Sequence, residues 1–352
     1  MVFPSDPIKA YQAKGEVKPR YYSPGVLFDE VHLISLCDRD IEPDKVQLLV
    51  GRAKLVIHPI GRPTMLTFPL FFHKALKVVR RIGPDAIRAH GVWHTGSLAV
   101  YCGRKLGVPV VVSIHNEHDQ QRKYSRQLKF HLVRPLEAYT LRRVDCAICI
   151  TEWVRAYAQR HGARRTAIIY NKVYTDQFHV AEKPAAPDRP TILTVMRLDP
   201  QKDPACLIRA MKDVDANLVM IGQGVLAESL KAMAAELGLR DRVTFIPSVP
   251  NTEIQAYYAR ADLFAMATLY EGFCIPVLEA MAAGVPVVAC DTEPLPEVLG
   301  GTGLIVPRTP EAFARAFTTL LADPDRRRTM AMAGRRRADR KSTRLNSSHG
   351  KL

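Results

Sequence analysis

Long hydrophobic runs are absent from the sequence, and none approaches the roughly 18 apolar residues that a membrane-spanning helix needs. A signal peptide is also absent, because the strand-like residues 1–4 lead into polar residues, and we therefore expect a cytoplasmic protein. Cysteine is sparse: the seven residues are an odd number and lie mostly in apolar runs, which favours reduced thiols over disulfides. The hydrophobic fraction of 47% excludes a disordered chain, and 352 residues suffice for two domains with full cores.

Acidic residues are too few to balance the basic ones, giving a formal net charge of +15. The excess is uneven: the net charge is +13 in residues 1–180, −7 in residues 181–325 and +9 in residues 326–352. A basic first half suits an anionic partner such as a lipid-phosphate acceptor or an anionic membrane surface. Charge that merely confers solubility explains the excess equally well. Nucleic acid is not expected, because no basic motif interleaved with aromatic residues is present.

Residues 262–290 read as a β-α-β unit. Residues 263–268 and 285–290 are short apolar runs of strand length, and residues 275–283 have helical spacing. Pro276 suits the first helical turn, and Gly284 suits the left-handed position after the last one. The two strands are therefore expected to lie parallel in one sheet.

Two glutamates, Glu271 and Glu279, flank the start of that helix eight residues apart. They should lie near the carboxyl end of a strand, where open α/β sheets bind ligands. Free N–H groups at a helix start attract anions, and carboxylates accept hydrogen bonds from hydroxyls. The pair therefore suits a ligand made of phosphate and sugar, although an isolated pair at this spacing is more often a solvated turn acid and an ordinary helical glutamate.

The segment resembles the E-x7-E signature of retaining, nucleotide-sugar-dependent glycosyltransferases of family 4. The resemblance covers residues 83–321 and includes NKVYTDQF at 171–178, the R-x4-K spacing at 197–202, Gly222-Gln223-Gly224 and the run PEVLGGTGLIVP. It implies an α/β protein with the GT-B fold, in which two Rossmann-like domains with parallel sheets face a central cleft.

The resemblance also implies site residues. Arg197 and Lys202 would clamp the diphosphate, Glu271 would contact the donor hexose, and Glu279 would bind the ribose hydroxyls. The remaining donor-site residues that it implies are Gly222, Gly224, Gly272, Phe273, Cys274 and Ile275. His115 matches the histidine of the family at the cleft and joins Glu271, Arg197 and Lys202 in the catalytic set. Asp203 and Lys172 stand where the family commonly has glycine.

No metal site and no cofactor are expected, because protein cations would neutralise the leaving diphosphate. Asp38-Arg39-Asp40 and Asp213-Val214-Asp215 have the D-x-D pattern with which GT-A enzymes hold Mn²⁺, but nothing nearby supports a metal at either. His115 and His118 lack further ligands in helical register, which argues against zinc.

Domain boundaries follow from composition. Residues 1–180 are expected to form the acceptor-binding domain, and residues 181–190, with three prolines, a linker. Residues 191–325 alternate strand and helix and form the expected nucleotide-sugar domain. Residues 326–340 read as part of a last helix. The remainder, KSTRLNSSHGKL at 341–352, reads as vector-derived sequence on a truncated gene or as a disordered tail.

Three stretches of the first domain carry further expectations. Residues 46–50 read as a strand. Residues 65–82 form an amphipathic basic helix, which could lie on anionic lipid or simply face the core. Residues 119–144 read as one long basic helix or a helix pair, either contacting the acceptor or presenting a solvated face.

The predicted function is transfer of a sugar from a nucleotide diphosphate sugar to a hydroxyl acceptor, which could be a glycan or a lipid-linked molecule, in cell-envelope or polysaccharide synthesis. A sugar-nucleotide epimerase of the same fold is the alternative enzyme, and it would turn over donor without acceptor. A non-catalytic sugar-nucleotide-binding remnant is the alternative from another class. The expected location is the cytoplasm, with peripheral contact to the inner face of the membrane left open.

Overall fold

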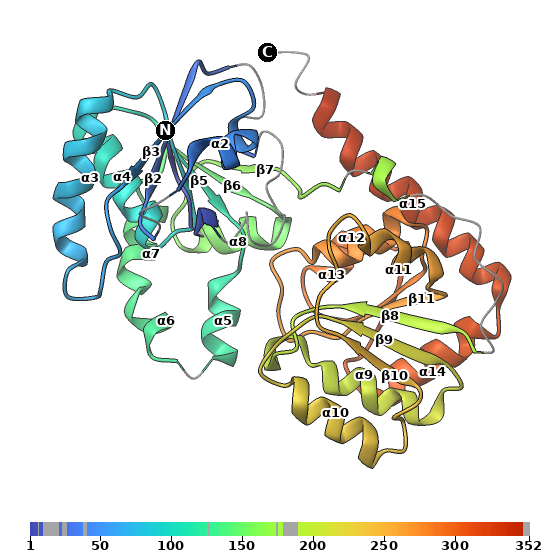
Figure 1. Ribbon diagram of the computed structural model, residues 1–352. Helices are drawn as coiled ribbons and strands as arrows, with labels where there is room; N and C mark the ends of the chain where they lie inside the picture. Colours follow the sequence, from blue (N-terminus) through green and yellow to red (C-terminus); the bar gives the residue numbers. More distant parts are fainter. Residues whose placement is uncertain are drawn as a thin grey trace. The chain divides into compact units, whose positions relative to one another are not determined.

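The chain forms two compact units, Met1–Ile169 and Tyr170–Leu352 (Figure 1). The computed structural model describes residues 1–5, 7–9, 21–22, 27–37, 41–125, 127–173, 175–178 and 189–347. Most of the expected linker, residues 181–188, and the aspartates of the first D-x-D pattern, residues 38–40, lie outside the described residues.

The N-terminal unit contains a parallel sheet whose described strands follow the order β3-β2-β1-β4-β5-β6-β7. Its strands are β1 (Val2–Phe3), β2 (Glu30–Ser35), β3 (Lys54–Pro59), β4 (Ile87–His90), β5 (Val110–Ile114), β6 (Cys146–Cys149) and β7 (Thr166–Ile168). Its helices are α2 (Pro43–Val46), η1 (Gln47–Val50), α3 (Phe68–Ile82), α4 (His94–Leu106), α5 (His118–Tyr124), α6 (Lys129–Leu132), α7 (Arg134–Leu141) and α8 (Glu152–Arg160).

Glycines set how closely α4 packs in the N-terminal unit. A Cβ on Gly103 would lie 2.2 Å from Val110 Cγ2, so the helix backbone lies directly against β5. A Cβ on Gly96 would lie 2.8 Å from Thr140 Cγ2, which makes the same kind of contact with α7. Side chains at these two positions would push the helix off its neighbours, since real Cβ atoms do not approach so closely.

The C-terminal unit contains a second parallel sheet, with described strands in the order β10-β9-β8-β11-β12-β13. The strands are β8 (Thr191–Val195), β9 (Asn217–Ile221), β10 (Val243–Ile246), β11 (Leu263–Met266), β12 (Val287–Cys290) and β13 (Leu304–Val306). The helices are η2 (Thr175–Gln177), η3 (Pro200–Lys202), α9 (Pro204–Ala210), η4 (Met211–Asp213), α10 (Ala227–Glu236), α11 (Ile254–Arg260), α12 (Ile275–Ala282), α13 (Leu295–Leu299), α14 (Pro310–Leu321) and α15 (Pro324–Ser347).

The strand order of this second sheet reverses between β8 and β11. Connections from β8 run outward through β9 to β10, whereas β11 begins the other half of the sheet. Loops leaving the carboxyl ends of two such strands diverge, and ligands bind in open α/β sheets at this switch point. The predicted β-α-β unit is present as β11, α12 and β12, and its parallel pairing is confirmed.

The last helix, α15, fastens α12 and α13 in the C-terminal unit. Arg335 Nη1 donates hydrogen bonds to the carbonyls of Ala282 and Phe178. Arg337 donates to the carbonyls of Val298 (2.8 Å) and Glu297 (2.7 Å). Guanidinium groups at the last carbonyls of a helix cap them and complement the helix dipole. The helix that begins next to the expected site is therefore fixed at its far end.

Three sequence expectations differ from the structure. Residues 46–50 are helical, in α2 and η1, because Pro43 opens a helix and a short apolar run cannot be told from a buried helical turn by pattern alone. Residues 119–144 form three helices, with Pro135 at the start of α7. Helix α15 continues past Arg340 to Ser347, in the stretch that the sequence analysis reads as vector-derived or as a disordered tail. Residues 348–352 lie outside the described residues.

None of the helices that the structure describes combines the length and the apolar composition needed to cross a membrane.

Candidate functional site

The loops that follow β8 and β11 are hydrogen-bonded to each other at the switch point. The carbonyl oxygen of Gln201 in η3 accepts hydrogen bonds from the Leu269 backbone N–H (2.7 Å) and from Thr268 Oγ1 (3.1 Å). The side-chain amide of Gln201 donates to the Tyr270 carbonyl oxygen (2.9 Å). Gln201 thus joins the R-x4-K loop to the turn that carries Glu271.

Lys202, in the loop after β8, and Glu271, in the loop after β11, form an ion pair at this switch point. Both side chains are largely buried, with 14% of the lysine and 8% of the glutamate exposed. Burial alone would lower the pKa of Lys202, but Glu271 raises it, and the net shift is upward. Lys202 is therefore a buried ammonium ion next to a carboxylate, at the position where the sequence predicts a diphosphate and a hexose.

Arg197 lies beside this pair with 68% of its side chain exposed. Its guanidinium contacts Asp199 Oδ2 (3.1 Å) and donates to Gln201 Oε1 (3.2 Å). Burial raises the pKa of the neighbouring Tyr270 phenol, Asp199 raises it further, and Arg197 and Lys202 act in the opposite direction. The charges of Arg197 and Lys202 therefore both act on this phenol.

Gly222 and Gly224 lie against the backbone of the Arg197 loop. A Cβ at Gly222, whose φ is +146°, would lie 1.8 Å from the Met196 carbonyl oxygen. A Cβ at Gly224 would lie 2.1 Å from the Leu198 carbonyl oxygen. Only glycine permits this approach. These two residues therefore fix the backbone on both sides of Arg197, which gives them a structural task in addition to the ligand contact that the sequence predicts.

Helix α12 begins beside Glu271 with a strained residue. Cys274, its N-cap, has φ +72° and provides no side-chain hydrogen bond to the first turn. Burial raises the pKa of its thiol, so the thiol stays protonated and is a poor nucleophile. Asp203, where the family commonly has glycine, also has a left-handed conformation (φ 44°) and pairs with Arg308 (2.7 Å). Aspartate tolerates this conformation better than most residues do.

Glu279 faces a residue that the sequence analysis did not identify. The hydroxyl of Tyr258, in α11, donates to Glu279 Oε2 (2.8 Å). Tyr258 is fully buried, and burial raises the pKa of its phenol well above the usual value, with Glu279 acting in the same direction. A tyrosine about twenty residues before a glutamate has no local signature, so only the packing of α11 on α12 reveals it.

His115 belongs to the N-terminal unit, at the end of β5. Its ring stacks on that of His90 at 5.6 Å with an angle of 7° between the planes. Tyr21 also stacks on His90, at 5.4 Å. Burial, followed by Arg88 and His115, holds the pKa of His90 well below the usual range, so His90 is neutral at neutral pH.

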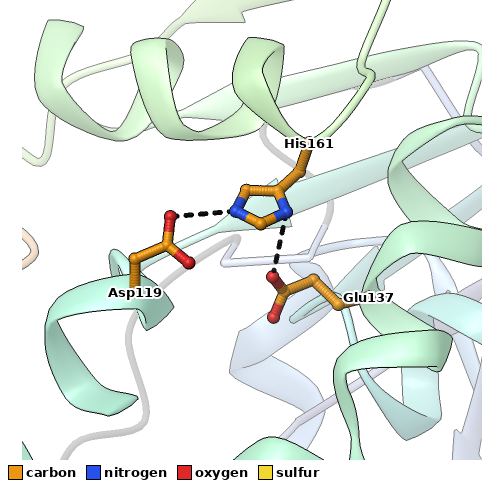
Figure 2. Close-up of side chains that lie close together, drawn as sticks. All are labelled: Asp119, Glu137 and His161. Atoms are coloured by element: carbon orange, nitrogen blue, oxygen red, sulfur yellow. Dashed lines mark hydrogen bonds and ion pairs between the residues drawn. The ribbon is translucent and has the colours of Figure 1, made fainter. Parts of the chain in front are cut away.

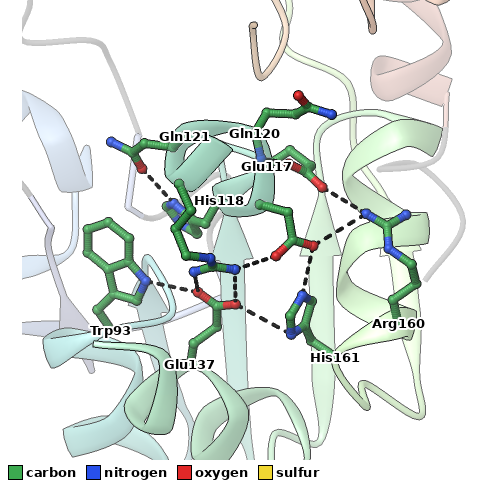
Figure 3. Close-up of polar contacts among 10 residues, drawn as sticks. Trp93, Glu117, His118, Gln120, Gln121, Glu137, Arg160 and His161 are labelled. Atoms are coloured by element: carbon green, nitrogen blue, oxygen red, sulfur yellow. Dashed lines mark hydrogen bonds and ion pairs between the residues drawn. The ribbon is translucent and has the colours of Figure 1, made fainter. Parts of the chain in front are cut away.

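The N-terminal unit also contains an ion-pair network that the sequence analysis missed (Figure 3). Arg122 of α5 donates to both oxygens of the fully buried Glu137 of α7 (2.8 and 2.9 Å) and also pairs with Asp119. Glu117 caps α5 by accepting from the Gln120 backbone N–H (2.6 Å) and pairs with Arg160 of α8 (2.7 Å). The network fixes α5, which follows His115, against α7 and α8.

Three members of this network could in principle ligate a metal ion (Figure 2). Ligand atoms of Asp119, Glu137 and His161 lie within 4.8 Å of one another. His161 places Nε2 2.9 Å from Asp119 and Nδ1 3.5 Å from Glu137. Arg122 already contacts both carboxylates, so a cation would have to displace a guanidinium. The arrangement is that of an ion-pair network.

Two family models match the chain in succession. Residues 27–172 match the glycosyl transferase 4-like domain, and residues 176–337 match glycosyl transferases group 1. The chain therefore belongs to the glycosyltransferase family whose two domains these models describe. Each of the two units corresponds to one of the models.

Relatives and solved structures agree with this assignment. A GDP-mannose-dependent alpha-(1-6)-phosphatidylinositol monomannoside mannosyltransferase of Mycolicibacterium smegmatis is 39% identical over 163 residues, which is 42% of this chain and 43% of that enzyme. An alpha-D-kanosaminyltransferase of Streptomyces kanamyceticus is 29% identical over 265 residues, covering 67% of this chain and 68% of that enzyme. The match to the mycobacterial relative thus spans less than half of its length.

Two solved structures share the fold. The Anabaena HepE protein in complex with UDP-glucose has a TM-score of 0.75 at 17% identity and covers 100% of this chain and 99% of its own. Sucrose-phosphate synthase from Thermosynechococcus elongatus has a TM-score of 0.73 at 21% identity, covering 99% and 94%. The GT-B fold predicted from the sequence is confirmed.

Proposed function

We propose that this chain transfers a sugar from a nucleotide diphosphate sugar to a hydroxyl acceptor, with retention of anomeric configuration and without a metal ion. The observation that carries the proposal is the meeting of Arg197, Lys202 and Glu271 at the switch point of the C-terminal sheet, next to the start of α12. Family membership and the donor-dependent names of the relatives support the same reaction.

The charges at this edge suit a departing diphosphate. Lys202 offers a point charge and Arg197 a planar fork, and together they neutralise the charge that develops on the leaving group. The first turn of α12, which lacks a side-chain cap at Cys274, adds backbone N–H groups. Protein cations thus take the part that a divalent metal plays in other transferases, and this is why we expect activity in the presence of a chelator.

Glu271 and Glu279 would recognise hydroxyls of the donor. In the resting structure Lys202 pairs with Glu271, and an incoming diphosphate would share the ammonium while Glu271 accepts hydrogen bonds from the hexose. Because Lys202 already pairs with Glu271, we assign Glu271 to donor recognition and charge stabilisation rather than to covalent attack. Attack of the acceptor on the face that the leaving phosphate departs from, assisted by that phosphate, therefore fits retention best.

The acceptor site is proposed to lie in the N-terminal unit, with His115 at the carboxyl edge of its sheet. The net charge of +13 in residues 1–180 suits an acceptor with a phosphate group. The mycobacterial relative is named for a phosphatidylinositol mannoside acceptor, which supports a lipid-linked molecule of this kind.

Contact with an anionic membrane would bring the enzyme to such an acceptor. Met65 and Leu66, in the turn before α3, and Leu70, in its first turn, are 67%, 93% and 63% exposed, and Lys74 and Lys77 follow on the helix. Apolar side chains beside lysines favour an anionic bilayer surface. Flotation with phosphatidylglycerol vesicles should succeed at low salt and fail for a Leu66→Asp variant or with phosphatidylcholine vesicles. Failure to float with phosphatidylglycerol vesicles would refute membrane contact, and equal flotation with both lipids would refute the dependence on anionic lipid.

The deciding experiment measures release of nucleoside diphosphate from UDP-glucose and GDP-mannose, with and without phosphatidylinositol mannoside, in EDTA. Acceptor-dependent release, with an α-linked product seen by NMR, is the predicted outcome. Conversion of donor without acceptor would identify the epimerase. Saturable binding of nucleotide with no release under any condition would identify the binding remnant.

A further inference from the structure

Tyr258 connects two parts of the donor site that the sequence treats separately. Its hydroxyl donates to Glu279 Oε2 (2.8 Å) and also lies 3.3 Å from the Pro276 carbonyl oxygen in the first turn of α12. Its ring packs against Phe178 and Phe264, with centroids 5.8 Å away in both cases. The two phenylalanines therefore fix the ring of Tyr258, and its hydroxyl in turn fixes the carboxylate of Glu279.

The chemistry of this contact favours orientation over stability alone. A buried phenol keeps its proton, so Tyr258 can only donate to the carboxylate. A hydrogen bond to an ionised acceptor is short and strong, and it selects one rotamer of a side chain that otherwise has three rotatable bonds. A carboxylate has about four lone-pair positions, so one that accepts from tyrosine retains the capacity to accept from two neighbouring hydroxyls.

We propose that Tyr258 is a positioning residue for donor recognition, which holds the carboxylate of Glu279 toward the vicinal hydroxyls of the donor ribose. This inference rests on the proposed function, because it assigns Glu279 to the nucleoside. Tyr258 also contacts the first turn of α12, so it ties the ribose carboxylate to the helix start expected at the diphosphate.

The test compares nucleotides that differ only in the ribose. Calorimetry would measure binding of UDP and GDP, and of their 2′,3′-dideoxy analogues, to the wild-type chain and to the variants Tyr258→Phe and Glu279→Ala. Tyr258→Phe should weaken binding of the ribonucleotide about tenfold, the typical value of a hydrogen bond to a charged group, and leave the dideoxy analogue nearly unchanged. In turnover, KM for donor should rise while kcat stays within about twofold, because ground state and transition state lose the same contact.

Controls separate positioning from folding. Tyr257→Phe removes the hydroxyl of the adjacent, half-buried tyrosine and should leave all affinities unchanged. Adding Tyr258→Phe to Glu279→Ala should cause no further loss, because the partner is already gone. Should Tyr258→Phe fail to fold, Glu279→Asp serves instead, since the shorter side chain keeps the charge but not the reach to Tyr258, and it should lose ribose discrimination.

Two results would overturn the proposal: equal weakening of ribonucleotide and dideoxy analogue by Tyr258→Phe, or undiminished ribose discrimination in Glu279→Asp. A wild-type chain that binds neither UDP nor GDP would instead refute the proposed function. The two failures are therefore distinguishable.

Discussion

The two units each hold a cluster of charged side chains, and the clusters differ in what surrounds them. In the N-terminal unit, Arg122 and Glu137 are buried and hydrogen-bonded to each other on several sides. In the C-terminal unit, Lys202 and Glu271 form a pair with fewer partners, and Arg197 beside them is mostly exposed. The first cluster is closed by its own members, whereas the second includes Arg197, whose guanidinium is mostly exposed although it contacts Asp199.

This difference separates a structural cluster from a binding site. The Glu137 carboxylate contacts the Arg122 guanidinium and the His161 imidazole, and it also accepts a hydrogen bond from the Trp93 indole N–H (3.1 Å). A buried carboxylate with these partners needs no ligand, and removing one partner leaves an uncompensated charge. An exposed guanidinium beside a half-satisfied ammonium can accept an anion with little rearrangement. We therefore expect substitutions in the first cluster to change stability and substitutions in the second to change activity.

The largest effect is expected at Glu137. Replacing it by alanine should lower the free energy of unfolding by about 3–5 kcal/mol, because Arg122 would remain buried without its main partner. Urea denaturation would measure this change. Glu152→Ala, which breaks the exposed pair with Arg155, is the control and should cost less than about 1 kcal/mol. Similar losses for the two variants would contradict the structural reading of the network.

Lys202→Ala should reduce turnover about 100-fold, the scale of one lost electrostatic contact in a transition state. Lys231→Ala, at an exposed lysine of the same unit, should have no effect. Without Lys202, the Glu271 carboxylate is left buried without its cation, which should lower the unfolding midpoint. The double variant Lys202→Met/Glu271→Gln removes that charge as well, and it should restore the unfolding midpoint without restoring turnover. Recovery of activity in the double variant would show that the pair is structural like the network.

Gly224→Ala should reduce turnover about tenfold by displacing the Leu198 carbonyl and with it Arg197, a shift of the size that costs positioned groups much of their effect. Gly334→Ala in α15 is the matched control, because its Cβ would meet no atom closer than 3.6 Å. That variant should gain about 0.5–1 kcal/mol of stability, as expected for alanine in a helix. Unchanged turnover in Gly224→Ala would show that Gly224 is not needed to position Arg197.

The smallest effect concerns pH. Burial raises the pKa of Glu137, but Arg122 and Trp93 lower it more, and the net shift is downward. Stability from this residue is therefore present above the usual carboxyl pKa and is lost as the pH falls through the lowered value. The Lys202 pKa is raised, so its contribution is lost only in alkaline solution. Below about pH 4.5, the Tm of Glu137→Gln should change less with pH than the Tm of the wild type. The same dependence of Tm on pH in the two proteins would contradict this.

The sequence predicts the donor-side residues because they lie in short local motifs. Arg197 and Lys202 are five residues apart, and Glu271 and Glu279 are eight apart, and both spacings match motifs of the family that the sequence resembles. The expected alternation of strand and helix in residues 191–325 is likewise present, and β11, α12 and β12 match the predicted ranges to within a few residues. The roles of the site residues stay predictions.

The rest depends on contacts between distant residues. Glu137 meets Arg122 and His161 only because α5, α7 and α8 pack together, and Tyr258 meets Glu279 only because α11 packs on α12. Neither pairing has a fixed spacing that a pattern could reveal. The expected strand at residues 46–50 was wrong for a related reason, since a short apolar run is equally compatible with a buried helical turn.

Calorimetric titration of UDP and GDP in EDTA into the wild-type chain and the variant Arg197→Ala/Lys202→Ala tests the central claim most directly. The account predicts that the wild type binds at least one of the two nucleotides without metal and that the double variant binds it at least about tenfold more weakly. Equal affinity of the wild type and the double variant would contradict it.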